Sequence, residues 1–180
     1  MDQQTAFIIS QIISVVTGIL AVVMMQLKSM KGVLIFEIIV NATTLSSYFL
    51  VGGDTGAFIC VLAMVQSVVM YLYKRKSKEP QLWVIILFII GYLGLSVYNI
   101  VQSKQIIDIL PACAAICFCL ALVQKKTAAF RIWGALNPLF WLGYDIYTKS
   151  YVLFCVHFGI LVSSIVGMIR LDGALRRKRS

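Results

Sequence analysis

The sequence predicts an all-α integral membrane protein, a bundle of seven transmembrane helices in a single domain over residues 1–180. Of its 180 residues, 61% are hydrophobic and only 13% are charged, and the mean hydropathy is +0.93, far above that of a soluble domain. Charge placement is the second observation. All 16 Lys and Arg residues except Lys104 and Lys149 lie in alternate gaps between apolar stretches. Because cytoplasmic loops retain positive charge, this alternation predicts a multi-pass topology.

Seven apolar stretches are each close to the roughly 20 residues that a spanning helix needs. They cover residues 6–27, 33–51, 55–73, 82–101, 106–123, 128–147 and 151–169. Before the first stretch the chain carries Asp2 and no basic residue, so we expect a retained helix rather than a signal peptide. Asp108 and Pro111 interrupt the fifth stretch. A five-span topology would leave basic loops outside, so the charge pattern favours seven.

The basic residues follow the first, third, fifth and seventh stretches. They are Lys28 and Lys31, then Lys74, Arg75, Lys76 and Lys78, then Lys125, Lys126 and Arg131, then Arg170 and the RRKR motif of the tail, residues 171–180. This predicts an N-terminus outside the cell and a C-terminus in the cytoplasm. The net charge of +9 is then explained by topology and by anionic lipid headgroups at the tail, without nucleic acid as a partner.

With seven spans, the first three and the last three helices run in the same direction. This predicts two parallel three-helix repeats and a connector helix, at about 6–73, 106–170 and 82–101 respectively. A shift of 96 residues places Asn41 on Asn137 and Tyr48 on Tyr144, with each Asn near the middle of its span. Equivalent polar residues in two halves are typical of a site at their interface.

Polar side chains recur at helical spacing on the second and sixth spans. They are Glu37, Asn41, Thr44 and Tyr48 on the second, and Trp133, Asn137, Trp141, Tyr144 and Thr148 on the sixth. A polar group in hydrocarbon needs a partner or water. The two stripes therefore predict either a solute site near the midplane or hydrogen bonds that hold the bundle together. For both Asn residues the two interpretations stay open.

Two ionisable residues lie inside predicted spans close to these stripes. Glu37 is one turn from the cytoplasmic end, where it either pairs with Lys31 or Arg131 or takes part in proton coupling. His157 is the only histidine, and it either extends the polar cavity or packs within the bundle. The candidate substrate-binding residues are Asn41, Asn137, Trp141, Tyr48, Tyr144, Glu37, Thr44 and His157.

Motifs for catalysis and metal binding are missing from the sequence. It has no nucleophile elbow, no Gly-rich phosphate loop and no paired-histidine zinc helix. All five cysteines fall inside apolar spans, where we expect small buried packing residues. They are Cys60, Cys113, Cys117, Cys119 and Cys155. The sequence thus predicts no enzyme, no metal and no cofactor.

Two long segments carry a family resemblance that covers most of the chain. They are SSYFLVGGDTGAFICVLAMVQSVVMYLYKRK from Ser46 and FWLGYDIYTKSYVLFCVHFGILVSSIVGMIRLD from Phe140. Their spacing and composition resemble the YgjV family of bacterial inner membrane proteins. The resemblance implies a location in the bacterial inner membrane, and it implies no particular activity.

The three-one-three helix arrangement is also similar, in architecture, to the SWEET sugar facilitators and the PnuC vitamin-precursor transporters. Those families line their pockets with Asn and Trp, so the similarity implies a comparable lining by Asn41, Asn137 and Trp141. SWEET-like proteins also carry a hinge proline in the first helix of each repeat. Pro111 can fill that role in the fifth span, whereas the first span has no proline.

The architectural similarity implies transport of a small polar solute, with two halves that rock around a midplane site. The alternative is a non-transporting accessory or scaffolding membrane protein. A solvent-accessible cavity containing Asn41 and Asn137 would favour transport. Polar groups that are bonded to one another and dry would favour the scaffold.

Overall fold

The computed structural model describes residues 2–26, 30–76, 78–122 and 127–167. These residues form seven α-helices and one 3₁₀ turn, with no strand among them, which confirms the all-helical fold class. The elements are α1 Gln3–Gln26, α2 Met30–Leu50, α3 Asp54–Arg75, α4 Leu82–Ser103, η1 Ile106–Ile109, α5 Leu110–Leu122, α6 Thr127–Tyr147 and α7 Tyr151–Gly167. Lys28, Lys125, Lys126, Arg170 and the basic tail lie outside the described residues.

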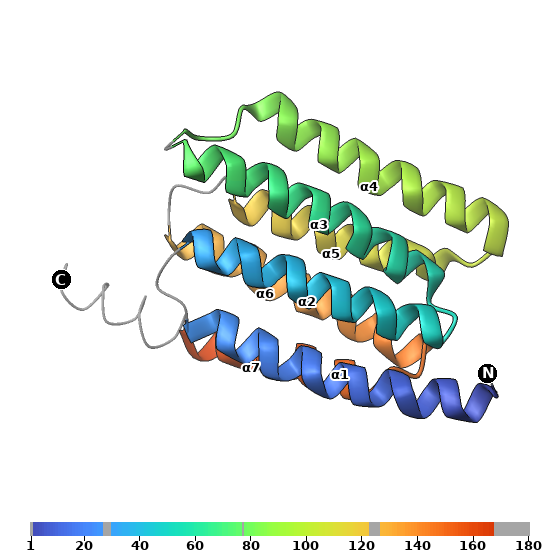
Figure 1. The fold of residues 1–180 in the computed structure, drawn as a ribbon. Helices are drawn as coiled ribbons and strands as arrows, with labels where there is room; N and C mark the ends of the chain where they lie inside the picture. Colours follow the sequence, from blue (N-terminus) through green and yellow to red (C-terminus); the bar gives the residue numbers. More distant parts are fainter. Residues whose placement is uncertain (1, 27–29, 77, 123–126, 168–180) are drawn as a thin grey trace.

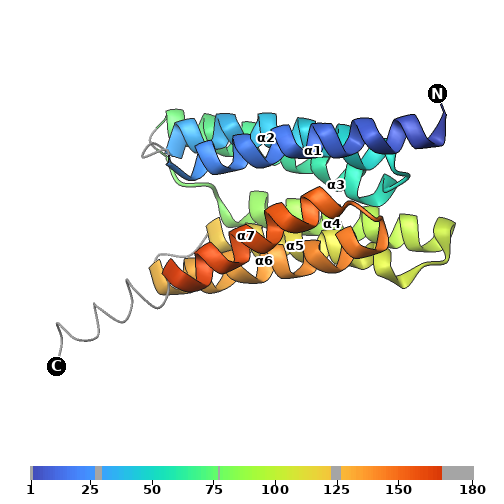
Figure 2. The ribbon, with the colours of Figure 1, turned by 90° about the horizontal axis from the view of Figure 1, so that it is seen from below.

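The helices form two layers (Figures 1 and 2). Helices α1, α2 and α3 lie side by side in one layer, and α7, α6 and α5 lie side by side in the other. At one edge α1 contacts α7, and at the opposite edge α4 packs against both α3 and α5. Consecutive helices run in opposite directions. The first and last three helices therefore face each other as two halves, with α4 at the edge where they meet.

The outside of the bundle is apolar, and its buried side chains include polar as well as apolar ones. On α1 the exposed side chains include Ile8, Ile12 and Ile19. Its buried face carries Ser10, Ser14 and Thr17, spaced by four and three residues. The Ser14 hydroxyl lies 2.7 Å from that of Ser47 on α2, so these helices are joined by hydrogen bonds. A soluble protein covers most of its helices with polar side chains, so this continuous apolar outer surface indicates a lipid environment.

Among the residues that the structure describes, four helices are long and apolar enough to cross a membrane. They are Gln3–Met24, Lys31–Leu50, Asp54–Arg75 and Leu82–Ser103, close to the first four predicted spans. Ile106–Ala121 and Tyr151–Val166 are apolar but shorter. Pro111 lies in the first turn of α5, where a missing N–H breaks no helical hydrogen bond. Its position gives no sign of a hinge inside the fifth span.

The turns after α2 and α6 have the same geometry. The Gly53 N–H donates to the Tyr48 carbonyl at 2.9 Å, and the Ser150 N–H donates to the Asp145 carbonyl at 2.9 Å. These two hydrogen bonds make Asp145 the equivalent of Tyr48. The 96-residue shift instead makes Tyr144 the equivalent of Tyr48, one position earlier in the chain. The repeat itself stays a prediction, but its register at this turn differs from the one that the identities suggest.

Candidate functional site

A buried carboxyl group joins the two layers. Tyr48, near the end of α2, donates its hydroxyl hydrogen to Asp145 Oδ1 on α6 at 2.5 Å. The other carboxyl oxygen, Oδ2, lies 2.6 Å from His157 Nδ1 on α7. The side chain of Asp145 is 0% exposed. Both carboxyl oxygens are therefore occupied, one by a residue of each half.

Trp141 fills the space beside this carboxyl group. Its indole is nearly parallel to the Tyr48 ring, with centroids 5.5 Å apart and planes at 15°. It also stacks on His157, with centroids 5.6 Å apart and planes at 12°. Stacked aromatic pairs at this separation contribute about 0.5–1.5 kcal/mol beyond the area they bury. The rings fix the phenol and the imidazole in position to reach Asp145.

Tyr144 completes the group, which we call the Asp145 cluster: Tyr48, Trp141, Tyr144, Asp145 and His157. The Tyr144 ring packs edge-to-face on Tyr48, with centroids 5.4 Å apart. Its hydroxyl oxygen accepts a hydrogen bond from the Gly56 N–H at 2.9 Å. Gly56 lies in the first turn of α3, where backbone N–H groups have no partner within the helix. A phenol from α6 thus caps a helix of the other half.

The sixth helix brings these groups together by its periodicity. Trp141, Tyr144, Asp145 and Thr148 are spaced by three, one and three residues, which places them on one face. The Thr148 hydroxyl donates to the Tyr144 carbonyl at 3.1 Å, so it is satisfied locally. Asp145 was not among the predicted site residues, although it lies within the predicted sixth span, 128–147. The signal was present, because Asp145 follows Trp141 by four residues.

The predicted stripe on α2 is only partly in contact with α6. Tyr48 reaches Asp145, as described above. The Asn41 amide instead donates to the Glu37 carbonyl at 2.8 Å and to Glu37 Oε1 at 3.2 Å. The Thr44 hydroxyl donates to the Val40 carbonyl at 2.8 Å. The partner of Glu37 in the described residues is therefore Asn41 rather than Lys31, and the side chain of Arg131 lies outside them.

The second predicted amide has a partner of its own. Asn137 donates to the Ala114 carbonyl of α5 at 2.8 Å, within the same half. Its bond does not involve Asn41 or any residue of α2. Of the eight predicted site residues, the structure gathers Tyr48, Trp141, Tyr144 and His157 in one cluster. Glu37, Asn41, Thr44 and Asn137 form separate local bonds, and a role for them in solute binding stays a prediction.

A second buried network, which we call the Gln66 cluster, lies where α4 meets the two layers. It consists of Gln66 on α3, Tyr92 on α4 and Cys119 on α5. The Tyr92 hydroxyl donates to Gln66 Oε1 at 2.5 Å, and Gln66 Nε2 donates to Cys119 Sγ at 3.2 Å. Cys119 was expected to be an apolar packing residue, and this network was not predicted. Cys119 is buried as expected, but its sulfur also accepts a hydrogen bond.

Metal binding was tested against the same residues. Within the described part of the chain, no three His, Cys, Asp or Glu side chains come together in a group that could hold a metal ion. Cys60, Cys117 and Cys119 are buried, whereas Cys113 is partly exposed and Cys155 is exposed. Asp145 and His157 therefore form a pair without a third ligand of these types.

The chain was compared with known proteins. A family model described as a bacterial inner membrane protein, Imp-YgjV, matches residues 8–174. No curated protein and no solved structure matches the chain. The match covers nearly the whole chain and confirms the resemblance that the two long segments indicated. The architectural similarity to SWEET and PnuC transporters is not confirmed by these comparisons.

Proposed function

The chain belongs to the Imp-YgjV family of bacterial inner membrane proteins, and from this premise we propose that it transports a small polar solute rather than catalysing a reaction. In this proposal its two three-helix halves move against each other, and the solute binds at the Asp145 cluster. The observation that supports the proposal is the completely buried Asp145, which is hydrogen-bonded to a residue of the opposite half.

An ionisable group inside a membrane bundle is expensive to keep. Translocon-based scales put an Asp at the centre of a spanning helix at about 2.5–3.5 kcal/mol, which is an upper bound for Asp145 in the last turn of α6. Such residues usually face the bundle interior, pair with one another and mark a solute or ion pathway. Asp145 is buried and paired in this way, because its carboxyl oxygens contact Tyr48 and His157.

The geometry also suggests how a solute would bind. If the halves separate at α2 and α6, the Tyr48 hydroxyl leaves Asp145 Oδ1 and one flat face of Trp141 loses its stacked partner. A solute with a hydroxyl or amino group would replace the phenol at the carboxyl oxygen, and a flat portion of the solute would stack on the indole. Closing the opposite side would complete alternating access.

We propose seven membrane spans with the N-terminus outside and the C-terminus in the cytoplasm. Helices α1 and α7 begin at the same end of the bundle (Figure 1). The start of α1 and the end of α7 therefore lie on opposite sides, as an odd number of spans requires. The charge alternation decides which side is cytoplasmic. A fluorescent protein fused to the C-terminus should fold and fluoresce, whereas a periplasmic phosphatase fused there should stay inactive.

The rival function is an accessory or scaffolding role without transport. Its support is that Asn137 on α6 donates to the Ala114 carbonyl of α5, as a group that merely holds helices together would do, while Asn41 is bonded within its own helix. In this interpretation the Asp145 cluster is a structural contact between the halves. The two functions differ in whether a solute competes for that contact.

The test compares two matched tyrosine variants, Tyr48→Phe and Tyr92→Phe. Each removes one hydroxyl from a fully buried ring, but only Tyr48 belongs to the Asp145 cluster. The purified protein is heated with a panel of sugars, nucleosides and vitamin precursors. A solute at 100 times its Kd should raise the unfolding midpoint of the wild type by about 5–10 °C. Tyr92→Phe should keep this shift. Tyr48→Phe should enlarge it, because the solute no longer has to displace the phenol hydroxyl from Asp145 Oδ1.

Uptake into liposomes then separates the two functions. A solute that raises the midpoint should enter liposomes that contain the wild type faster than empty liposomes. Equal uptake, together with identical solute shifts in both tyrosine variants, would contradict transport at the Asp145 cluster and favour the scaffold.

A further inference from the structure

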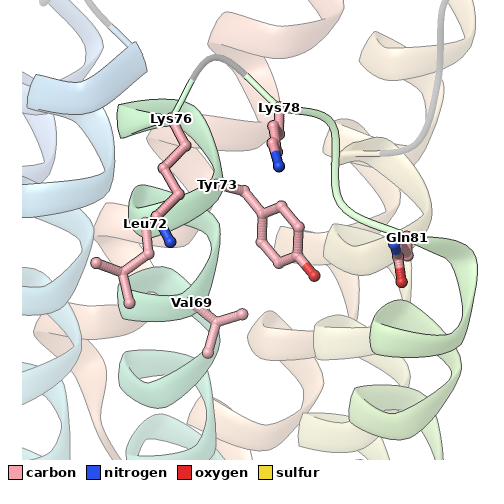
Figure 3. A pocket seen from close by; sticks show the side chains of 6 residues that line it. All are labelled: Val69, Leu72, Tyr73, Lys76, Lys78 and Gln81. Atoms are coloured by element: carbon pink, nitrogen blue, oxygen red, sulfur yellow. The ribbon is translucent and has the colours of Figure 1, made fainter.

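A cleft of about 320 Å³ lies at the end of α3, beside the segment that leads to α4. Its lining is shown in Figure 3 and consists of Val69, Leu72, Tyr73, Lys76, Lys78 and Gln81. The first four are spaced by three, one and three residues, which places them on one face of α3 and its C-cap. The volume is at the lower end of the range for small-molecule sites, about 300–1,000 Å³.

The lining changes from apolar to cationic along the direction of α3. Val69 and Leu72 lie in the last two turns of Asp54–Arg75, a candidate membrane span. Lys76 and Lys78 lie just beyond this span, and both are exposed. Figure 3 shows the Tyr73 ring between the two ends, with its hydroxyl directed away from α3. An apolar wall on the membrane side and cations on the water side match the order of groups in a phospholipid.

The two lysines are available to bind an anion. Among the described residues, the ion pair in this segment joins Lys74 to Glu79 at 4.0 Å, and it involves neither Lys76 nor Lys78. No carboxylate lines the cleft to neutralise them. A lysine ammonium is a compact point charge suited to phosphate oxygens. The cleft thus presents two unpaired positive charges at the water side.

The neighbouring residues mark this cleft as lying at the membrane surface. Trp83 is 60% exposed at the start of α4, as expected of an aromatic side chain at the boundary between lipid and water. Its indole N–H donates to Gln81 Oε1. This bond occupies the amide oxygen of Gln81 and leaves its N–H₂ group to donate into the cleft.

We propose that this cleft binds the headgroup of an anionic phospholipid. Lys76 and Lys78 bind the phosphate, the Tyr73 hydroxyl and the Gln81 amide donate hydrogen bonds to headgroup or ester oxygens, and Val69 and Leu72 contact the start of an acyl chain. This site is separate from the Asp145 cluster and does not depend on transport. It is also more specific than a general attraction of basic loops to an anionic surface.

The experiment uses two double variants that remove the same charge from the same end of the bundle. Lys76→Gln with Lys78→Gln alters the cleft. Lys31→Gln with Arg75→Gln removes two exposed cations outside it and is the matched control. Binding of phosphatidylglycerol and of phosphatidylcholine to the detergent-purified full chain is measured by native mass spectrometry. Inorganic phosphate is added in a separate titration as a soluble competitor.

The wild type should bind phosphatidylglycerol at least about tenfold more tightly than phosphatidylcholine, as two lysines near a lipid surface allow. The cleft variant should lose most of this preference, and the control should retain it. Equal losses in both variants would show a general surface-charge effect and overturn the proposal, as would a preference that neither variant changes. Phosphate at millimolar concentration that displaces the lipid completely would overturn the lipid assignment in favour of a soluble phosphate.

All four substituted side chains, Lys31, Arg75, Lys76 and Lys78, are exposed, so both double variants should fold. The unfolding midpoint in phosphatidylcholine alone checks this directly. Tyr73→Phe is a second, milder variant, because it removes one hydroxyl and no charge. It should weaken phosphatidylglycerol binding by a few-fold, and an unchanged affinity would exclude Tyr73 from the site.

Discussion

The Asp145 cluster and the Gln66 cluster use the same geometry with different chemistry. In each, a tyrosine that is 0% exposed donates its hydroxyl to a side-chain oxygen at 2.5 Å, from Tyr48 to Asp145 and from Tyr92 to Gln66. The acceptor is an ionisable carboxyl group in the first cluster and a neutral amide in the second. The first links α2 to α6 and α7, whereas the second links α3, α4 and α5.

This difference separates two reasons for keeping polar groups in a membrane bundle. A hydrogen bond from a neutral amide side chain to another helix contributes only about 0.6 kcal/mol on average, which is enough to hold helices in place. A carboxyl group between an imidazole and a phenol also carries the cost of burying an ionisable group, which a purely structural contact does not need. The comparison therefore supports a packing role for the Gln66 cluster and the function that we propose for the Asp145 cluster.

The largest effect is expected for Asp145→Ala. It leaves the Tyr48 hydroxyl and the His157 imidazole without their shared partner, at a cost of about 1–3 kcal/mol for each group. Gln66→Ala is the corresponding change in the Gln66 cluster. It should cost about 1–2 kcal/mol, because the groups that lose their partner, the Tyr92 hydroxyl and the Cys119 thiol, are neutral. Free energies of unfolding in mixed micelles with increasing SDS measure both. A cost for Gln66→Ala equal to that for Asp145→Ala would remove the energetic distinction between the clusters.

A smaller effect is expected from the two tyrosine hydroxyls. Tyr48→Phe should cost about 1.5–3 kcal/mol, the range for hydrogen bonds to charged groups. Tyr92→Phe should cost about 0.5–1.5 kcal/mol, the range for neutral groups. Both rings keep their packing, so the difference between the two free-energy costs depends on the hydrogen-bond acceptor alone. The same SDS titration applies, and the prediction fails if Tyr92→Phe is the more destabilising substitution.

The helices were predictable because their signals are local. A run of apolar residues of sufficient length specifies a spanning helix wherever it packs, and α4, Leu82–Ser103, ends within two residues of the predicted 82–101. The fifth element was less regular, since Ile106–Ile109 forms a 3₁₀ turn before α5 begins. The aromatic residues of the Asp145 cluster were also named from the sequence. Trp141 and Tyr144 share one face of the sixth span, and Tyr48 lies in the corresponding stripe of the second span.

The pairing of polar groups was not predictable in the same way. Whether Asp145 is buried depends on where α2 and α7 lie, and the sequence of α6 alone does not give their positions. The 96-residue shift paired Tyr48 with Tyr144, whereas the turns pair Tyr48 with Asp145. One residue changes the face of a helix by about 100°, so a register that fits identities need not fit contacts.

Glycines next to the two clusters give a third comparison. A Cβ on Gly56 would lie 2.6 Å from Tyr144 Cε1 and 3.0 Å from Tyr48 Cδ2, so two buried rings would have to move. A Cβ on Gly91 would lie 3.1 Å from Leu62 Cδ2, the flexible end of a side chain. Gly56→Ala should therefore cost about 1–3 kcal/mol, the range for overpacking. Gly91→Ala should be close to neutral, because added helix propensity offsets a small rearrangement.

Thermal unfolding of both alanine variants gives the test of this difference. Gly56→Ala should also weaken the protection by a bound solute, since it displaces the rings that hold Asp145. If Gly91→Ala is the more destabilising change, the aromatic wall is more adaptable than the contacts indicate.

The smallest expected effect is the coupling between the clusters. Among the described residues Tyr48 and Tyr92 share no hydrogen-bond partner, so their Phe substitutions should add to within about 0.3–0.5 kcal/mol in the double variant. Tyr48→Phe and His157→Gln act on the same carboxyl group and should instead show a coupling of about 0.5–3 kcal/mol. Strong coupling between the tyrosines would mean that one half cannot shift at Asp145 without disturbing the contact with α4. The proposed rocking motion requires the two halves to move independently of α4, and strong coupling would contradict this.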